Sequence, residues 1–414
     1  MREFLIPKKI VKSSGVTNAK ALLIKKDKQI GLDEPSVTEF EAGSYIILDF
    51  GKEICGGVRL LTYMSDKLPV RIRLGESVSE CCAELYGEKN ATNDHSLRDI
   101  TVTLPKYSDM SFCQSGFRFV RLDFEGEASL KNVWADSVIL KKRAIGRYTG
   151  DDKLIKKIFD TAKRTVDLSA SGEYLWDGVK RDRLVWIGDI HPEMLALTAL
   201  YGRLDVIERS LDFVKAQTPL PNFMNRFPMY SMWWLIIVSD YYKYTGARDF
   251  AEKQLMYAEG LVDLMLSCTK ETGELDYPSY FVDWPTHNRP DEIHGVRAIN
   301  IMAAKSAIEL LGAFSKDTKK AEALLERLMK IRIDAKEAKQ IFGLKHFAVG
   351  LDEADKQKLT EGGARGMSTF MSYYILKAVA SFDKGAAIKM MKEYYGAMLS
   401  MGATTFFEDF DITW

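Results

Sequence analysis

The stretch Phe117-Arg118-Phe119-Val120-Arg121-Leu122-Asp123-Phe124 sets the fold class of the first part of the chain. Charged side chains alternate with apolar ones at a period of two, so one face of the predicted strand packs on a core and the other meets water. Shorter runs of the same kind, separated by turn residues, span residues 44–51, 58–61, 69–75 and 100–104. Several such strands at close spacing predict an antiparallel β-sandwich over residues 1–145.

The pattern changes to a helical period after Gly150. Apolar residues recur at four-residue steps from Leu154 to Val166, which predicts an amphipathic helix. The same periodicity predicts further helices over residues 191–203, 205–217, 229–244, 249–268, 293–312, 318–332, 367–381 and 385–400. The segment 229–238 is apolar on every side, as the inner helix of a two-layer helical ring would be. A helical domain is therefore predicted over residues 146–414.

The composition excludes several classes of protein. Among 414 residues, 58 are basic and 58 acidic, and 46% are hydrophobic. This hydrophobic share is ample for a large core, and the zero net charge argues against a nucleic-acid partner. The five cysteines have no metal-ligand spacing, which predicts free thiols and no metal site. No signal peptide or apolar run of ~20 residues is seen, so we expect a cytoplasmic protein without a membrane partner.

The densest group of chemistry-bearing residues is the segment Trp176–Asp189, which combines carboxylates, guanidinium groups and indoles. Gly178 and Gly188 interrupt the helical pattern, which predicts a loop leading into a helix that starts near His191. One interpretation is a solvated loop whose Arg–Asp pairs cap that helix. The other is a sugar site, because an indole contacts the C–H face of a sugar while carboxylates accept its hydroxyl hydrogens.

Two other segments pair a carboxylate with an aromatic ring. Glu408 follows Phe407 near the end of the chain, and Asp283 precedes Trp284 in the longest non-helical insert. Each pair also has a structural interpretation, as a C-terminal acidic turn packed on a helix end or as an N-cap beside a packed indole. The histidines show no metal-ligand spacing, and His294 either lines a pocket or is a satisfied structural residue.

These motifs resemble those of the bacterial α-L-rhamnosidases, which are six-hairpin glycosidases. The family's loop carries an Asp, an acid five positions later, an Arg, a Trp and a Gly-Asp, matched here by Asp177, Asp182, Arg183, Trp186, Gly188 and Asp189. The similarity extends to Gly402-Ala403-Thr404 ahead of Phe407-Glu408, and to the N-terminal segments 48–57 and 73–77. Two departures are that the family's acid is usually Glu, whereas this chain has Asp182, and that family members normally continue well past Glu408.

The resemblance implies a fold, a reaction and a set of site residues. The fold is an antiparallel β-sandwich followed by an (α/α)6 toroid of helical hairpins. The nine or ten helices expected here fall short of twelve, so the ring is either incomplete at the C-terminus or completed unusually. The reaction is release of terminal α-L-rhamnose with inversion, in which Asp182 protonates the leaving oxygen and Glu408 activates water. The residues implied in substrate binding are Asp177, Arg181, Trp186, Asp189, Asp283, Trp284 and His294.

The resemblance implies no metal or organic cofactor, and the partner it implies is a rhamnosylated glycan or glycoside. Two alternatives stay open. One is a related glycosidase or a glycoside phosphorylase acting on another sugar. The other is a non-catalytic, rhamnosidase-like protein that holds sugar without cutting it, which the shorter acid at Asp182 favours.

Overall fold

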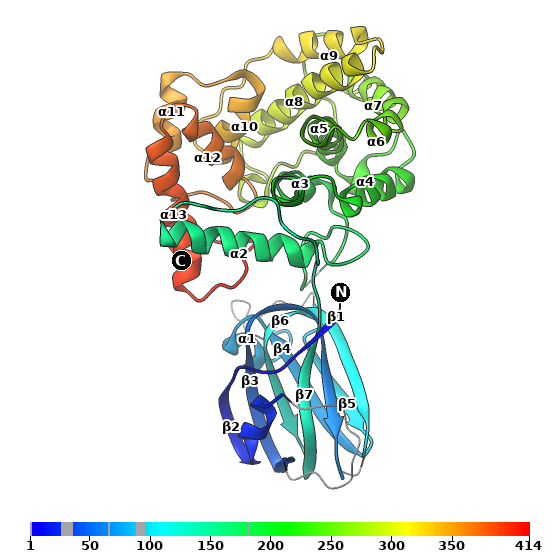
Figure 1. Cartoon of the computed structure of the whole chain (residues 1–414). Coiled ribbons are helices and arrows are strands. Elements are labelled where there is room, and N and C mark those ends of the chain that lie inside the picture. Colours follow the sequence, from blue (N-terminus) through cyan, green and yellow to red (C-terminus); the bar gives the residue numbers. More distant parts are fainter. Residues whose placement is uncertain (1, 26–35, 65–66, 88–95, 181) are drawn as a thin grey trace. The chain divides into compact units, whose positions relative to one another are not determined.

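The computed structural model describes residues 2–25, 36–64, 67–87, 96–180 and 182–414 (Figure 1). The chain divides into two compact units. The first comprises residues 1–141, 167–172 and 176–184, and the second comprises residues 142–166, 173–175 and 185–414. Segment 176–184 of the predicted loop therefore groups with the first unit. The predicted domain boundary after residue 145 stays a prediction.

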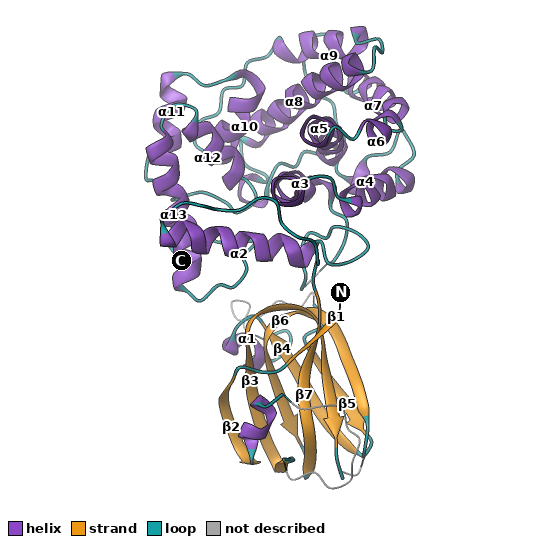
Figure 2. Ribbon diagram, in the orientation of Figure 1, coloured by secondary structure: helices purple, strands orange, loops and turns teal. Residues whose placement is uncertain are grey.

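The first unit is built around one hydrogen-bonded sheet (Figure 2). Its described strands are β1 (Arg2–Leu5), β2 (Lys9–Thr17), β3 (Thr38–Thr62), β4 (Leu68–Gly75), β5 (Asp99–Leu104), β6 (Asp109–Phe124) and β7 (Ala128–Val138), and a short helix, α1 (Val78–Cys82), follows β4. The strand order is β1-β7-β3-β6-β4-β5, with β2 paired to β3. The alternating run 117–124 lies in β6, which is antiparallel to both β3 and β4. All five predicted strand segments lie in strands.

The long strand β3 contains two of the predicted segments, 44–51 and 58–61, which we expected to be separate strands. The strand is continuous, and its pairing with β6 has irregularities between Asp49 and Ile54 and between Gly56 and Val58. A side chain at Gly56 would place its Cβ 1.9 Å from the Asp136 carbonyl oxygen, so only glycine fits there. Turn residues in the sequence thus mark bulges rather than strand ends.

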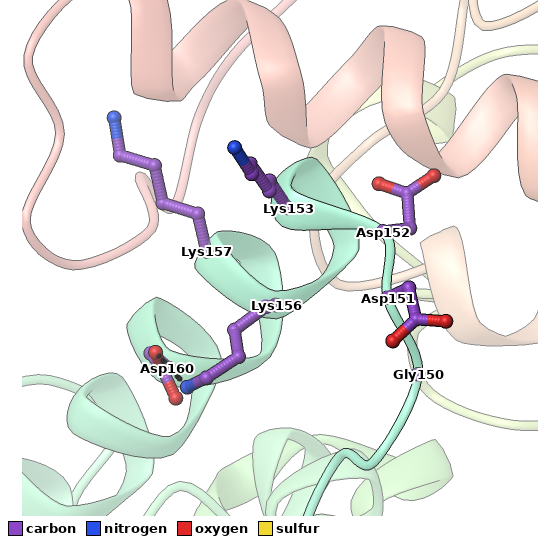
Figure 3. A pocket seen from close by; sticks show the side chains of 7 residues that line it. All are labelled: Gly150, Asp151, Asp152, Lys153, Lys156, Lys157 and Asp160. Atoms are coloured by element: carbon purple, nitrogen blue, oxygen red, sulfur yellow. Dashed lines mark hydrogen bonds and ion pairs between the residues drawn. The ribbon is translucent and has the colours of Figure 1, made fainter.

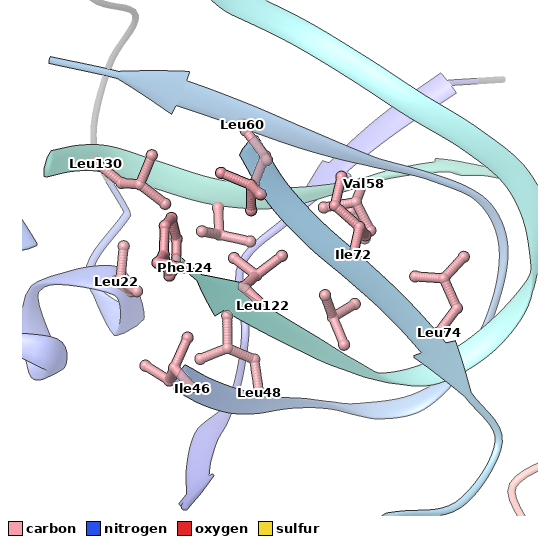
Figure 4. Packing of buried hydrophobic residues seen from close by; sticks show 14 of the residues in the cluster. Leu22, Ile46, Leu48, Val58, Leu60, Ile72, Leu74, Leu122, Phe124 and Leu130 are labelled. Atoms are coloured by element: carbon pink, nitrogen blue, oxygen red, sulfur yellow. The ribbon is translucent and has the colours of Figure 1, made fainter. Parts of the chain in front are cut away.

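The core of the first unit is formed by the apolar faces of these strands (Figure 4). Ile46 and Leu48 of β3 and Leu122 and Phe124 of β6 are buried, and the Phe124 ring stacks on Phe40 with centroids 4.1 Å apart. Full burial of one such side chain contributes about 1.5–3 kcal/mol. The alternation that predicted the strand is therefore also what stabilises the unit.

The second unit is helical (Figure 2). Its described α-helices are α2 (Lys153–Ser169), α3 (Ile187–Tyr201), α4 (Asp205–Gln217), α5 (Pro228–Thr245), α6 (Arg248–Glu252), α7 (Leu255–Ser267), α8 (Glu292–Ala313), α9 (Lys319–Met329), α10 (Lys339–Val349), α11 (Glu353–Thr360), α12 (Ser372–Ala380) and α13 (Lys384–Ser400). Every predicted helical segment contains helix, and α5 is buried continuously from Pro228 to Ser239, as predicted for an inner helix. None of the described helices is long and apolar enough to cross a bilayer.

The predicted helix count was too low, because α10 and α11 were missed and residues 249–268 form α6 and α7. Twelve α-helices, α2 to α13, lie in the described part of this unit. The pattern of α10 is concealed because it buries Lys339 and Lys345. Lys339 donates to the Gly363 carbonyl, and Lys345 is 2.6 Å from Asp355 of α11. Buried charges that are paired in this way look like surface residues in the sequence.

Candidate active site

The predicted loop is closed at its base by a pair of hydrogen bonds. Asp177 N donates to the Leu184 carbonyl at 3.2 Å, and Leu184 N donates to Asp177 Oδ1 at 2.9 Å. Between these ends lies Asp182, which is exposed and has a φ of 53°, followed by Arg183 with a φ of 54°. Two consecutive non-glycine residues in the left-handed region are costly, and such backbone is concentrated at functional sites. Arg181 lies outside the described residues.

The helix after the loop starts earlier than predicted. α3 begins at Ile187, not near His191, so Gly188 lies inside the helix instead of ending it. A glycine stands at this helical position because of the Tyr230 ring. A Cβ at position 188 would lie 2.4 Å from Tyr230 Cε1. The glycine is therefore required for the close approach of an aromatic side chain to the first turn of α3.

A single amide side chain fixes the backbone around Trp186. Asn225 Oδ1 accepts from Ile187 N at 3.0 Å, and Asn225 Nδ2 donates to the Val185 carbonyl at 3.1 Å. Asn225 itself has a φ of 51°, a conformation that asparagine adopts more readily than most residues. Asn225 thus fixes the backbone directly before and directly after Trp186, although no sequence motif indicated this residue.

Four rings, those of Trp186, Phe227, Phe281 and Trp284, form a continuous row that we call the aromatic strip. The successive centroid distances are 6.2 Å, 5.1 Å and 5.0 Å. Trp284 is 68% exposed, although most large aromatic side chains of this unit are buried. Trp186 and Trp284 are both among the residues that the resemblance implies in substrate binding, and the two phenylalanines lie between them in the row. An exposed indole at the end of a packed row of rings suits the C–H face of a sugar.

Asp283 adjoins the strip and is buried, with only 6% of its surface exposed. Burial raises the pKa of its carboxyl to about 6, although hydrogen bonds from the Ser368 hydroxyl and the Trp284 backbone lower it, and the charges of Asp409 and Glu408 raise it further. Asp283 and Glu408, both predicted from sequence, are therefore close enough to interact. A carboxyl that is partly protonated near neutrality can donate a hydrogen bond as well as accept one.

The segment after α13 carries Glu408 and is fixed at two points. Phe406 N donates to Thr165 Oγ1 of α2 at 3.0 Å, and the Tyr394 hydroxyl donates to the Phe410 carbonyl at 2.9 Å. Glu408 lies between these anchors and is exposed. The position of Glu408 is thus set by two helices. One is α2, which is far from Glu408 in the sequence, and the other is α13, which directly precedes this segment.

Asp189 and His191 lie in the first turns of α3, next to a buried polar chain. The Tyr374 hydroxyl is hydrogen-bonded to His191 Nδ1 at 2.6 Å, and His191 Nε2 is 3.0 Å from Asp240 Oδ2. The pKa of Tyr374 is raised well above its usual value by burial and by nearby charges, Asp189 among them. His191 is therefore a satisfied interior histidine, and Asp189 borders the network that it forms.

His294 lies with a different group of residues. Its Nδ1 accepts from Asp334 N at 3.2 Å, which ties α8 to the loop ahead of α10. Burial lowers its pKa, while the charges of Asp291 and Asp334 oppose that shift. This contact is the structural role left open by the sequence, and a role in substrate binding stays a prediction.

Two hollows in the second unit lie away from the predicted residues. One, of about 300 Å³, is lined by acidic and basic side chains from Gly150 to Asp160 (Figure 3). The other, of about 630 Å³, is bordered by residues of α4 and of the loop before α5, Asn225 among them. In the part of the chain that the structure describes, no three His, Cys, Asp or Glu side chains are grouped to hold a metal ion.

No family model and no curated protein matches this chain by sequence. Among solved structures, however, it is similar to glycosidases. A rhamnosidase from Klebsiella oxytoca, solved with rhamnose bound, is 18% identical with a TM-score of 0.76, and the match covers 99% of this chain and 90% of that one.

Two further rhamnosidases give the same result. The GH78 family rhamnosidase of Bacillus sp. GL1 is 16% identical with a TM-score of 0.73, over 95% of this chain and 45% of that one. The α-L-rhamnosidase from Dictyoglumus thermophilum is 17% identical with a TM-score of 0.70, and the match covers 99% of this chain and 48% of that one. The chain thus spans about half the length of these two. It has the fold of the rhamnosidases, which confirms at the level of fold the resemblance seen in the motifs.

Proposed function

We propose that the protein is a glycoside hydrolase that releases terminal α-L-rhamnose from rhamnosides with inversion of configuration. The observation that carries this proposal is the group formed by Asp283, Glu408 and Trp284. The Asp283 carboxyl is buried, its pKa is raised in part by the charge of Glu408, and it adjoins the exposed indole of Trp284. An apolar face beside a few polar groups is the usual composition of a carbohydrate site. The rhamnosidase fold supports the choice of sugar.

The proposed architecture is an antiparallel β-sandwich followed by an (α/α)6 toroid. The pairings between the described strands support it, since all are antiparallel except that of β3 with β7, and so do the twelve described α-helices of the second unit. In this arrangement a ring closes when its last helix reaches its first. The bond from Phe406 N to Thr165 of α2 joins the segment after α13 to the first helix of the unit.

In the proposed reaction, the Asp182 carboxyl gives its proton to the glycosidic oxygen as the bond to the anomeric carbon breaks. Glu408 accepts a proton from a water molecule that attacks the opposite face of that carbon. The two carboxyls of an inverting pair are about 6.5–9.5 Å apart, which leaves room for this water. Asp177, Arg181 and Asp189 are proposed to bind sugar hydroxyls, while Trp186 and Trp284 contact the methyl-bearing face.

Asp283 is proposed to bind a sugar hydroxyl from its buried position, with Ser368 orienting the carboxyl. His294 is retained as a predicted contact. The partner is proposed to be a carbohydrate, and the cytoplasmic location expected from the sequence is part of the same proposal.

The test is turnover of an aryl α-L-rhamnoside by the wild-type protein, Asp182→Asn and Glu408→Gln. Each substitution should lower kcat by about 10²–10⁴-fold, because this is what proton transfer by a positioned carboxyl contributes. Asp409→Asn is the matched control, since it neutralises the neighbour of Glu408 and should keep most activity. Proton NMR during turnover should show β-L-rhamnose as the first product.

Three results would contradict this proposal. Full activity in either acid variant would remove its assigned role. Release of the α-anomer first would exclude inversion. Calorimetric binding of L-rhamnose without turnover of any rhamnoside would support the sugar-binding alternative, and a dependence of turnover on phosphate would identify a phosphorylase.

A further inference from the structure

The loop that carries Asp182 is tied to the rest of the sheet unit by an ion-pair cluster, in which Lys180 and Glu80 are buried and Glu76 is partly exposed. Lys180 Nζ donates to Glu76 Oε2 at 2.8 Å and pairs with Glu80 of α1. The Lys180 side chain is only 12% exposed, and that of Glu80 only 5%. Burial lowers the pKa of Lys180, but the two carboxylates outweigh this effect and raise it overall, so the ammonium group stays charged.

The Glu80 carboxylate that receives Lys180 is itself held by the start of α1. Glu80 Oε2 accepts from Glu76 N at 2.8 Å, and Glu80 N donates to the Ser77 hydroxyl at the start of α1. The cluster is thus preorganised on the sheet unit, and Lys180 is the residue through which the loop engages it. Removing one partner of such a buried group leaves the others uncompensated, which costs far more than the loss of a surface pair.

The backbone of the loop also lies directly on β6. A Cβ at Gly116 would be 2.8 Å from Val179 Cγ2 and 2.9 Å from Lys180 N, so the loop fits only against a glycine. Ser115 Oγ donates to the Lys180 carbonyl at 3.4 Å, and Arg183 Nη1 donates to the Gln114 carbonyl at 2.5 Å. Contacts with the sheet therefore precede and follow Asp182 along the chain.

The contacts of the loop with the sheet unit explain its unusual backbone. The backbone at Asp182 and Arg183 is in the left-handed region, a conformation that persists only where the surroundings enforce it. The described contacts that flank this backbone come from β6 and α1 of the sheet unit. The guanidinium of Arg183 also lies 4.4 Å from the centroid of the Trp176 ring, which holds the second left-handed residue from the loop's own side.

We propose that Lys180 is a positioning residue for the acid step, because its ion pairs with Glu76 and Glu80 hold the loop in the conformation that presents Asp182. This inference rests on the proposed function. It gives the sheet unit a part in the chemistry, since a group on α1 determines where the proton donor lies. A displacement of about 1 Å in a catalytic group can cost about 10²-fold in rate.

The test compares Lys180→Met with the wild-type protein on two rhamnosides that differ in their leaving groups. A dinitrophenyl rhamnoside leaves without a proton, whereas an alkyl rhamnoside needs the acid. Lys180→Met should lower kcat about 10²-fold on the alkyl rhamnoside and less than about threefold on the dinitrophenyl rhamnoside. Lys180→Arg should restore most of the loss. Lys141→Met is the control, because Lys141 forms an ion pair with Glu3 of the same unit.

A purely structural role would lower both rates equally and would reject the proposal, as would full activity of Lys180→Met on the alkyl substrate. Hydrogen exchange at the amides of Asp177 and Leu184 tests the clamp without reference to catalysis. Exchange should be faster in Lys180→Met and unchanged in Lys141→Met. If the wild-type protein cleaves neither rhamnoside, the proposed function fails, while unchanged exchange in Lys180→Met overturns the clamp itself.

Discussion

Asp283 and Asp291 lie eight positions apart on either side of one turn, and their pKa values are shifted in opposite directions. Both are buried, with 6% and 7% of their surfaces exposed. Asp291 accepts backbone N–H groups from Lys336, Glu337 and Ala338 at 2.8–3.2 Å. Burial raises its pKa, but these three donors outweigh that effect, and the pKa is lowered overall.

Asp283 has a poorer supply of donors. It receives a hydroxyl and one backbone N–H, and it faces the charges of Glu408 and Asp409, so its pKa rises to about 6. The comparison shows that burial alone does not identify a functional carboxylate. A structural carboxylate is supplied with enough donors to stay ionised, whereas one left partly unsatisfied is available to a ligand.

The largest expected difference in unfolding free energy between the surroundings of Asp283 and those of Asp291 is that caused by Asp283→Asn. Because the folded-state pKa is raised, folding is favoured below the usual value of 3.8 and loses stability as the pH rises towards 6. The variant lacks this loss, so it should be more stable than the wild-type protein by up to about 3 kcal/mol above pH 6. Below pH 4 the difference should vanish.

Urea denaturation from pH 4 to pH 8 measures this difference. The same variant should bind L-rhamnose more weakly, since the strained carboxyl is proposed to be a ligand contact. A variant that is equally stable at every pH would show that the folded-state pKa of Asp283 is not raised, and a variant less stable at pH 7 would show that Asp283 is satisfied as Asp291 is.

Asp291→Asn should behave in the opposite way. The folded-state pKa of Asp291 is lowered, so its stabilisation is present above the usual value of 3.8 and is lost as the pH falls through the folded-state pKa. At pH 7 the variant should lose about 2 kcal/mol of unfolding free energy, because an amide cannot satisfy all the donors of the loop before α10. The same denaturation series should show the loss shrinking at low pH, and a constant loss would argue for a packing effect instead.

The fold was more predictable than the site, because periodicity is a local property of the chain. The alternation in residues 117–124 and the apolar segment 229–238 each indicate their own environment without reference to a partner. Helix α10 shows where this method fails. Its buried Lys345 is paired with Asp355 of the next helix, and nothing in the local pattern indicates a buried lysine.

For the site, the sequence supplied candidate residues, which stay predictions, but not the contacts between them. Asp283, Trp284 and Glu408 were named because each acid lies beside an aromatic ring in the sequence, a pairing that also has a structural interpretation. Ser368 and Asn225 were missed, because each acts on a segment far away in sequence and neither belongs to a motif. The left-handed backbone at Asp182 was also missed, since it depends on contacts with β6 that only the folded chain contains.

The smallest expected change in stability separates the aromatic strip from an ordinary surface. Trp284 is 68% exposed, so Trp284→Ala should change the unfolding free energy by less than about 0.5 kcal/mol. Its KM for a rhamnoside should rise several-fold with kcat little changed, because a lost apolar contact weakens binding of substrate and transition state alike. Tyr244→Ala is the matched control, as Tyr244 is 62% exposed on α5 and lies outside the strip. Equal KM values in the two variants would mean that the exposed end of the aromatic strip does not bind the sugar.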